Sequence, residues 1–322
     1  MVYETEDHEI QYCFPAINSS CIRGKHFRHE SNIMYMFFSL LSVWTVFLNL
    51  LVIISISHFK KLHTPTNLII LSLAVADMLV GFVMPIEATR LIEMCWHFGD
   101  TFCGVFLVIT GLLISASLYN LTLIAVDRYV AVCHPLLYQQ KITTTKTLII
   151  ICICWMWSSA YNISFATDPS SRTHGCYGEC PFMANSAWNM TDLFLSLLFP
   201  CTVIIILYLK IFYVVHQQVK AINTLMKGSV RRKSESKAAL TLGIIVTVYL
   251  LCWIPYYICF LTAVSSMTVN VLSWVLFINS GLNPMIYALF YPWFKKTVKL
   301  ILTLKIFQAA SSMVNILTEH QL

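Results

Sequence analysis

Charged residues are scarce in this chain. Of its 322 residues, 58% are hydrophobic and only 11% are charged, whereas globular domains carry about 25% charged residues. This composition excludes an ordinary water-soluble domain. The H-E-x-x-H motif of zinc peptidases and the G-x-S-x-G motif of serine hydrolases are also missing. The absences therefore predict a membrane protein that is not an enzyme and carries no catalytic residues.

Seven apolar segments are long enough to cross a bilayer as helices, which takes about 20 residues each. They occupy residues 34–58, 66–92, 102–126, 146–166, 189–214, 239–263 and 270–291. The sequence thus predicts an all-α membrane protein, a seven-transmembrane helix bundle at 34–291. An extracellular segment, 1–33, would precede it. A short amphipathic eighth helix on the inner leaflet and a cytoplasmic tail would follow at 292–322, where cationic and apolar residues alternate at helical spacing.

Lysine and arginine gather at one set of helix ends, which places those ends in the cytoplasm. The N-terminus is therefore expected outside and the C-terminus inside. The net charge of +6 follows from this asymmetry and suits anionic inner-leaflet lipid, so it does not indicate nucleic acid. Residues 1–30 are polar and acidic and do not resemble a cleavable signal peptide.

Six of the twelve cysteines map to the predicted exterior, an oxidising compartment where disulfides form. They are Cys13, Cys21, Cys95, Cys103, Cys176 and Cys180. Six cysteines allow fifteen pairings, so composition alone does not choose among them. The same exterior holds the sequon N-S-S at Asn18, a candidate glycosylation site.

Four carboxylates fall within or at the ends of the predicted spans, at Asp77, Glu87, Asp127 and Asp192. An ionisable group in a span costs roughly 2.5–3.5 kcal/mol on insertion scales, so each is a functional hypothesis. Prolines also interrupt three spans, at Pro200, Pro255 and Pro284. Each proline removes a backbone donor and kinks its helix. Kinked helices around polar side chains predict a bundle that can repack between two arrangements.

Motifs at matching positions in all seven spans make the chain similar to rhodopsin-class (class A) G-protein-coupled receptors. They are Asn49, L-A-V-A-D ending at Asp77, D-R-Y from Asp127, Trp155, Pro200 with Tyr208, C-W-I-P from Cys252 and N-P-M-I-Y from Asn283. Within that class the chain resembles the trace amine-associated receptors. The stretches that carry this closer resemblance are H-T-P-T-N from His63, C-W-H-F-G from Cys95, C-I-R from Cys21 with C-Y-G-E-C from Cys176, and the seventh segment from Asn279.

The resemblance implies specific pairings and sites. Cys103 should bond Cys180, and Cys21 should bond Cys176, which leaves the pairing of Cys13 and Cys95 open. A sodium ion in the inactive state would be held by Asp77, Ser117, Asn279 and Ser280, and oxygen ligands suit such a hard cation. Arg128 would pair with Glu235 to hold the cytoplasmic face shut. The full activation switch carried over from the family comprises Asp127, Arg128, Tyr129, Tyr208, Glu235, Trp253, Pro255, Asn283, Pro284 and Tyr287.

The chain departs from most amine receptors where they hold their ligand. An aspartate is usual in the third helix eighteen residues before the D-R-Y arginine, and here that position is Thr110. The tyrosine that accompanies it in the seventh helix is replaced by Phe277. The fifth helix, however, carries Asp192 eight residues before Pro200. In this respect the chain resembles some fish-type members of the family, which bind the amine from the fifth helix. The resemblance therefore makes Asp192 the expected ammonium anchor.

The remaining residues of the expected amine site are aromatic or hydroxylated. Aromatic faces attract ammonium groups, and hydroxyls accept or donate hydrogen bonds. The residues are Thr110, Ser196, Trp253, Tyr256, Tyr257, Phe260, Trp274 and Phe277. Two alternatives stay open for the carboxylates. Asp192 could face lipid headgroups or bond a tyrosine. Glu87 could pair with Arg90 or Arg172 as a structural salt bridge, or serve as a second ammonium site for a diamine.

The resemblance also implies partners and a location. It implies a protonated amine or diamine as ligand, a heterotrimeric G protein of the stimulatory type that raises cyclic AMP, and an arrestin and a receptor kinase. It implies the plasma membrane, with sensory cilia of olfactory neurons as one site, and no cofactor other than the sodium ion.

A receptor of the same build with a non-amine ligand, and a transporter, are the alternatives. The odd number of spans and the lack of repeats disfavour a transporter. A retinal photoreceptor is excluded, because its chromophore needs a lysine in the seventh helix and no lysine occurs between 238 and 294.

Overall fold

The computed structural model describes residues 11–23, 28–168, 176–180, 186–223, 244, 247–259, 262 and 266–308. Its first four long helices coincide with the first four predicted spans. They are α1 (Arg28–His58), α2 (Pro65–Glu93), α3 (Asp100–Cys133) and α5 (Thr144–Thr167), with the short η1 (Lys60–Leu62) and α4 (Pro135–Lys141) in the connections between them. Threonine side chains begin two of these helices: Thr64 accepts a hydrogen bond from Asn67 N, and Thr143 accepts one from Lys146 N.

The fifth predicted span is a continuous rod of three pieces: α6 (Ser186–Leu193), a π-helical turn η3 (Phe194–Leu198) and α7 (Phe199–Asn223). The sixth is described over Thr247–Cys259, an apolar helix. The seventh is α9 (Ser266–Phe290), followed by α10 (Pro292–Leu302) and η4 (Lys305–Phe307). Within the described chain, five helices are long and apolar enough to span a bilayer, and α9 with α10 gives a sixth if a bent pair counts as one.

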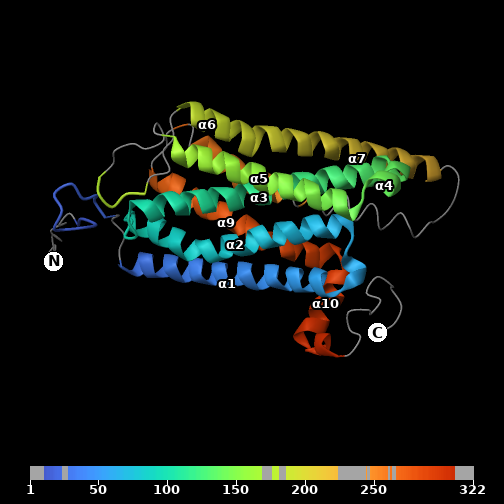
Figure 1. Cartoon of the computed structure of the whole chain (residues 1–322), viewed down its shortest axis with the longest axis horizontal. Coiled ribbons are helices and arrows are strands. Elements are labelled where there is room, and N and C mark those ends of the chain that lie inside the picture. The colour runs from blue at the N-terminus through green and yellow to red at the C-terminus, as the bar shows by residue number, and fades with distance from the viewer. Residues whose placement is uncertain are drawn as a thin grey trace, which may run out of the picture.

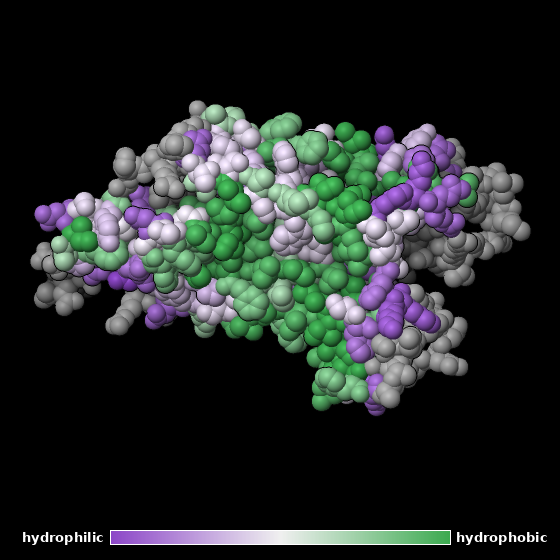
Figure 2. All heavy atoms as spheres, viewed as in Figure 1, coloured by the Kyte–Doolittle hydropathy of each residue, from purple (hydrophilic) through white to green (hydrophobic). Residues whose placement is uncertain are grey.

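The long helices lie side by side along the longest axis of the molecule, with α1, α2, α3 and α5 following one another across the bundle (Figure 1). A hydrophobic band covers the middle of the visible face, and hydrophilic side chains gather toward its two ends (Figure 2). This is the pattern expected of a protein whose middle faces lipid. The helix predicted after the seventh span is present as α10, which leaves α9 at 99°. Its placement on the inner leaflet stays a prediction.

Three interior prolines are each matched by a side chain from a neighbouring helix. A proline has no N–H to donate to the carbonyl four residues earlier. For Pro85 that carbonyl belongs to Gly81, and Ser42 Oγ of α1 donates to it at 2.8 Å. For Pro284 it belongs to Ser280, and Asn49 Nδ2 of α1 donates to it at 3.1 Å.

Pro200, at the start of α7, follows the same rule. The carbonyl four residues earlier is that of Ser196, and the hydroxyl of Tyr249 donates to it at 2.9 Å. Tyr249 is 2% exposed and comes from the helix Thr247–Cys259. A backbone break in lipid persists only where such partners satisfy it. The prolines therefore bind neighbouring helices together instead of merely weakening their own.

Three disulfides link the described N-terminal segment, the loop at 176–180 and the ends of α2 and α3. Cys103–Cys180 and Cys21–Cys176 are present, with Cα–Cα distances of 5.7 and 4.9 Å. These are the two pairs that the resemblance implied. A third bridge joins the pair that was left open, Cys13 to Cys95, at 5.6 Å. Around them the backbone of the N-terminal segment pairs with the long outer loop, since Tyr177 N donates to Ser19 O at 2.8 Å.

We expect Tyr249→Phe to lower the thermal stability of the detergent-purified protein. The change removes a single hydroxyl and leaves the Ser196 carbonyl without that donor in an apolar surrounding, a loss of about 1–3 kcal/mol. The matched control is Tyr213→Phe, because Tyr213 is 64% exposed. Equal melting temperatures for the two variants would contradict the proposed role of Tyr249.

We expect non-reducing peptide mapping of the protein from the cell surface to recover Cys13 linked to Cys95, beside the two other pairs. Replacing both Cys13 and Cys95 by serine should release the N-terminal segment from the first outer loop and speed its cleavage by protease. Recovery of Cys13 or Cys95 as a free thiol in the wild-type protein would rule out the third bridge.

Candidate functional site

The Asp192 carboxylate points into the bundle and is bonded only by neutral hydroxyls. Its Oδ1 accepts from Ser196 Oγ at 3.0 Å and from the Tyr161 hydroxyl of α5 at 3.2 Å. Its Oδ2 accepts from the Tyr257 hydroxyl at 2.9 Å. In the described part of the chain, no arginine, lysine or histidine pairs with it. The carboxylate therefore keeps an uncompensated negative charge inside the bundle, held in a fixed orientation.

Local helix geometry sets this arrangement. Asp192 is the penultimate residue of α6, and the π turn Phe194–Leu198 begins two residues later. A π turn is a frequent device at functional sites because it re-aims side chains without ending the helix. Here Ser196, within the turn, bonds back to Asp192 one turn earlier. Of the predicted partners of Asp192, the structure thus brings Ser196 and Tyr257 to it.

Tyr161 is a contact that the sequence analysis missed. It lies in α5 and also packs edge-on against Trp188 of α6, with ring centroids 5.9 Å apart. Nothing in the sequence predicts that Tyr161 hydrogen-bonds Asp192, since a tyrosine within an apolar helix usually serves packing. Of the alternatives that the sequence left open for Asp192, the structure shows the carboxylate bonded by two tyrosines, Tyr161 and Tyr257.

The predicted aromatic residues form a stack in the helix Thr247–Cys259. Trp253 is 6% exposed and lies between two tyrosines, 5.4 Å from Tyr249 and 6.0 Å from Tyr257 between ring centroids. Tyr256 meets Tyr257 edge-on at 5.5 Å. The stack thereby connects Tyr257, which bonds Asp192, with Tyr249, which bonds the Ser196 carbonyl.

The other predicted site residues are placed less directly. Trp274 packs edge-on against Phe38 of α1 at 5.1 Å, away from the stack. Phe277 is buried and lines a cavity together with Trp253. The hydroxyl oxygen of Thr110 is buried and has no hydrogen-bond partner within the described chain. Phe260 lies outside the described residues.

Glu87 is 4% exposed and forms a two-pronged ion pair with Arg90, one turn later in α2. Arg90 Nε donates to Glu87 Oε2 at 2.9 Å, and the second terminal nitrogen of the guanidinium donates to Oε1. The remaining terminal nitrogen reaches the Cys180 carbonyl at 3.4 Å. Of the alternatives that the sequence left open, the structure thus shows Glu87 in a salt bridge with Arg90.

Asp77 is fully buried and accepts hydrogen bonds from neutral donors, Ser117 Oγ and Asn283 Nδ2, both at 2.8 Å. The side-chain oxygens of Asn279 and Asn283 are buried and receive no hydrogen bond in the described chain. Ser280 is buried and, with Ser117 and Asn279, lines the cavity that Trp253 and Phe277 also line. A buried carboxylate with unpaired oxygens beside it is a donor set that fits a hard cation.

A different cluster lies at the end of α3 that carries the D-R-Y motif. Asp127 accepts from Thr66 Oγ1 at 2.7 Å, from the Tyr138 hydroxyl at 3.0 Å and from Arg128 Nε at 3.0 Å. Arg128 also donates to Thr66. Glu235, the expected partner of Arg128, lies outside the described residues. Of the other switch residues, Tyr208 and Tyr287 have buried hydroxyls without a described partner, and Pro255 is half-buried.

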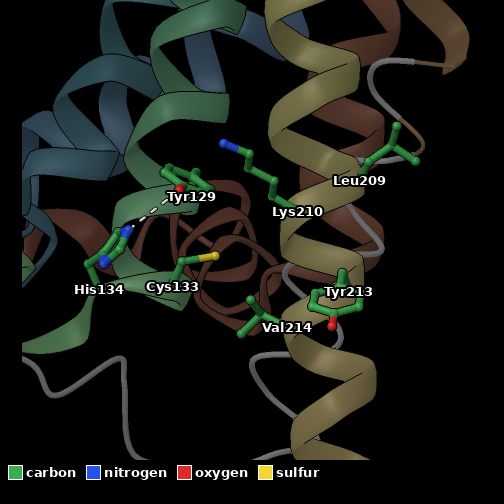
Figure 3. Close-up of a pocket in the computed structure, with 7 residues that line it drawn as sticks. All are labelled: Tyr129, Cys133, His134, Leu209, Lys210, Tyr213 and Val214. Atoms are coloured by element: carbon green, nitrogen blue, oxygen red, sulfur yellow. Dashed lines mark hydrogen bonds between the residues drawn. The ribbon is translucent and has the colours of Figure 1, made fainter.

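Beside this cluster, a pocket lies between the end of α3 and the middle of α7 (Figure 3). The Tyr129 hydroxyl oxygen lies 3.4 Å from His134 Nε2, and the Lys210 ammonium lies 5.7 Å from the Tyr129 ring centroid. Leu209, Tyr213 and Val214 of α7 with Cys133 of α3 complete its lining. Asn18, the candidate glycosylation site, is exposed.

Comparison with known proteins agrees with this architecture. Residues 48–287 match the model of the family described as 7 transmembrane receptor (rhodopsin family). Trace amine-associated receptor 13c of Danio rerio is 38% identical over 329 residues, which cover 96% of each chain. Trace amine-associated receptor 8a of Rattus norvegicus is 39% identical over 96% of this chain and 97% of its own.

Trace amine-associated receptor 6 of Homo sapiens is 38% identical over 97% of both chains. Matches of this extent cover the bundle and both ends of the chain, so they concern the whole architecture and not one motif. The chain therefore belongs to the rhodopsin family of seven-transmembrane receptors, among the trace amine-associated receptors, and it is a multi-pass plasma-membrane receptor rather than an enzyme.

Proposed function

We propose that an extracellular protonated amine activates this receptor and that its ammonium group binds the Asp192 carboxylate. The observation that carries the proposal is the set of partners around that carboxylate. Three hydroxyls orient it and none neutralises it. The names of the relatives, which associate them with trace amines, point to the same ligand class.

The energetics favour a cationic ligand at this position. Opposite charges 4 Å apart attract by about 4 kcal/mol at an effective dielectric constant of 20, before desolvation is subtracted. The aromatic faces of Trp253, Tyr256 and Tyr257 would each add about 0.5–2 kcal/mol of cation–π attraction if the ammonium lies over them. A neutral molecule of the same shape gains neither contribution, so charge is the first criterion of recognition.

The receptor acts through a heterotrimeric G protein, as its family does. We propose the stimulatory type, with a rise in cyclic AMP, the N-terminus outside and the C-terminus inside. Opening of the cytoplasmic end would release Arg128 from Asp127 and present the neighbouring surface to the G protein. A clamp between Arg128 and Glu235, later capture by a receptor kinase and an arrestin, and placement in olfactory cilia belong to the same proposal.

We also propose that a sodium ion binds at Asp77 in the inactive state, with Ser117, Asn279 and Ser280 around it. Support comes from the fully buried carboxylate and the unpaired oxygen of Asn279. The ion would supply the positive charge that the neutral donors do not, and so it would favour the arrangement in which these side chains converge.

We expect Asp192→Asn to reduce the potency of an activating amine by about tenfold or more, because the change keeps the shape of the side chain and removes its charge. A panel of mono- and polyamines supplies the agonist, and cyclic AMP with a G-protein dissociation reporter supplies the readout. Asp100→Asn is the matched control, since Asp100 is an exposed carboxylate at the outer end of α3. Unchanged potency in Asp192→Asn, at equal surface expression, would refute the anchor.

We expect sodium chloride to weaken agonist binding to membranes relative to the chloride of a bulky organic cation, because the ion would stabilise the inactive arrangement. Asp77→Asn should abolish that difference while antagonist-type ligands still bind. A sodium effect that persists in Asp77→Asn would place the ion elsewhere.

A further inference from the structure

The pocket between the end of α3 and the middle of α7 has a volume of about 410 Å³ and takes no part in the proposed amine site. Cys133 of α3 and Val214 of α7 point toward each other across it, and the side chain of Lys210 reaches from α7 toward α3 (Figure 3). Two further lining residues, Leu209 and Tyr213, are exposed on the surface of the bundle. Because they belong to a candidate span, Ala187–Gln217, the pocket opens toward the bilayer.

Lys210 brings a positive charge to this pocket. Its ammonium lies 5.7 Å from the centroid of the Tyr129 ring, a distance at which the ring face attracts a cation. No aspartate or glutamate of the described residues forms an ion pair with it. A lysine within a span is costly unless its charge finds a partner. The pocket therefore presents an ammonium group that the described side chains orient but do not neutralise.

The groups beside this ammonium suit an anionic oxygen. The Tyr129 hydroxyl oxygen and His134 Nε2 lie 3.4 Å apart, and each group can donate a hydrogen bond to such an oxygen. Lysine is itself a common binder of phosphate. Cys133 is the last residue of α3, so the pocket lies at the depth where this helix leaves the bilayer, which is the depth of the lipid headgroups.

The exposed side of α7 indicates which class of molecule covers the pocket. Ile205, Leu209 and Phe212 are exposed and follow one another four and three residues apart, so they form one apolar stripe along the helix. In a span, such a stripe faces acyl chains. An occupant that lies along this stripe and ends at Lys210 has to be apolar over most of its length and anionic at one end.

We propose that this pocket binds an acidic phospholipid of the inner leaflet, with its phosphate at Lys210 and an acyl chain along the stripe on α7. A zwitterionic headgroup carries its own ammonium, which competes with Lys210 for the phosphate, whereas an acidic headgroup keeps a net negative charge. Basic pockets between spanning helices bind acidic headgroups, and a lysine near the bilayer surface favours acidic lipid by about fivefold. This site does not depend on the amine anchor.

The test uses the full-length receptor in nanodiscs of phosphatidylcholine alone or of phosphatidylcholine with phosphatidylserine. The Cys133 thiol reports occupancy, because it lines the pocket and forms no disulfide. Its alkylation by a membrane-permeable maleimide, resolved by peptide mapping, should slow by about threefold to fivefold when phosphatidylserine is present. Cys152, an exposed thiol on α5, is the control and should react at the same rate in both bilayers.

Three variants separate the pocket from a general effect of surface charge. Lys210→Gln removes the cation and should abolish the protection by phosphatidylserine. Lys295→Gln is the matched control, since it removes the same charge from an exposed position on α10 and should leave the protection intact. Val214→Phe keeps Lys210 but fills the pocket, so it too should abolish the dependence of the Cys133 rate on phosphatidylserine.

Equal Cys133 rates in the two bilayers would overturn the proposal for the wild-type receptor, as would protection that survives Lys210→Gln. Should that variant fail to assemble into nanodiscs, protection that survives Val214→Phe has the same consequence. Protection by soluble glycerophosphoserine in phosphatidylcholine alone would show a phosphate site without a lipid, and it would overturn the assignment of an acyl chain. Protection by a heterotrimeric G protein, with none by phosphatidylserine, would make the pocket part of a protein interface instead.

Discussion

The bilayer offers no water to backbone groups, and much of this structure follows from that constraint. Pro85, Pro200 and Pro284 each leave a carbonyl without its helical donor. Ser42 and Asn49 of α1 satisfy two such carbonyls, in α2 and α9, and Tyr249 satisfies the third, at Ser196. Polar side chains that would be costly in lipid thus become the contacts that set which helices are neighbours. A seven-helix bundle without them would have only van der Waals packing to choose its arrangement.

Satisfying one of these carbonyls also links the proposed amine site to the sixth span. Ser196 bonds Asp192 through its side chain and Tyr249 through its backbone. Tyr249 in turn stacks on Trp253, and Tyr257 returns from the same helix to the carboxylate. A ligand that draws on the Asp192 charge therefore acts on residues that hold the helix Thr247–Cys259 in place. Differential contact of this kind is what allows a ligand to shift a conformational equilibrium.

The sequence predicted the fold well because hydrophobic length and motif register are local properties. Long apolar runs placed α2, α5 and α9 within four residues of their observed bounds, whereas α1 begins six residues earlier and α3 ends seven residues later than predicted. Partners across the bundle were harder to predict. Spacing along α2 allowed Glu87 to meet Arg90, yet the competing Arg172 and an unpaired state fitted the sequence equally. Tyr161 was missed because its hydrogen bond depends on how α5 packs, and the Cys13–Cys95 pairing depends on how the N-terminal segment folds over the bundle.

The described carboxylates within the bundle divide into two kinds according to whether their partners are charged or neutral. Asp127 and Glu87 are each paired with an arginine close by in the same helix, at one and three residues' distance. A pair of that kind neutralises itself during folding and serves structure. Asp77 and Asp192 are bonded by neutral donors alone. Since a charge without a counter-ion inside an apolar bundle is unfavourable, we infer that these two sites are completed from solution, by a metal cation at the first and by an ammonium group at the second.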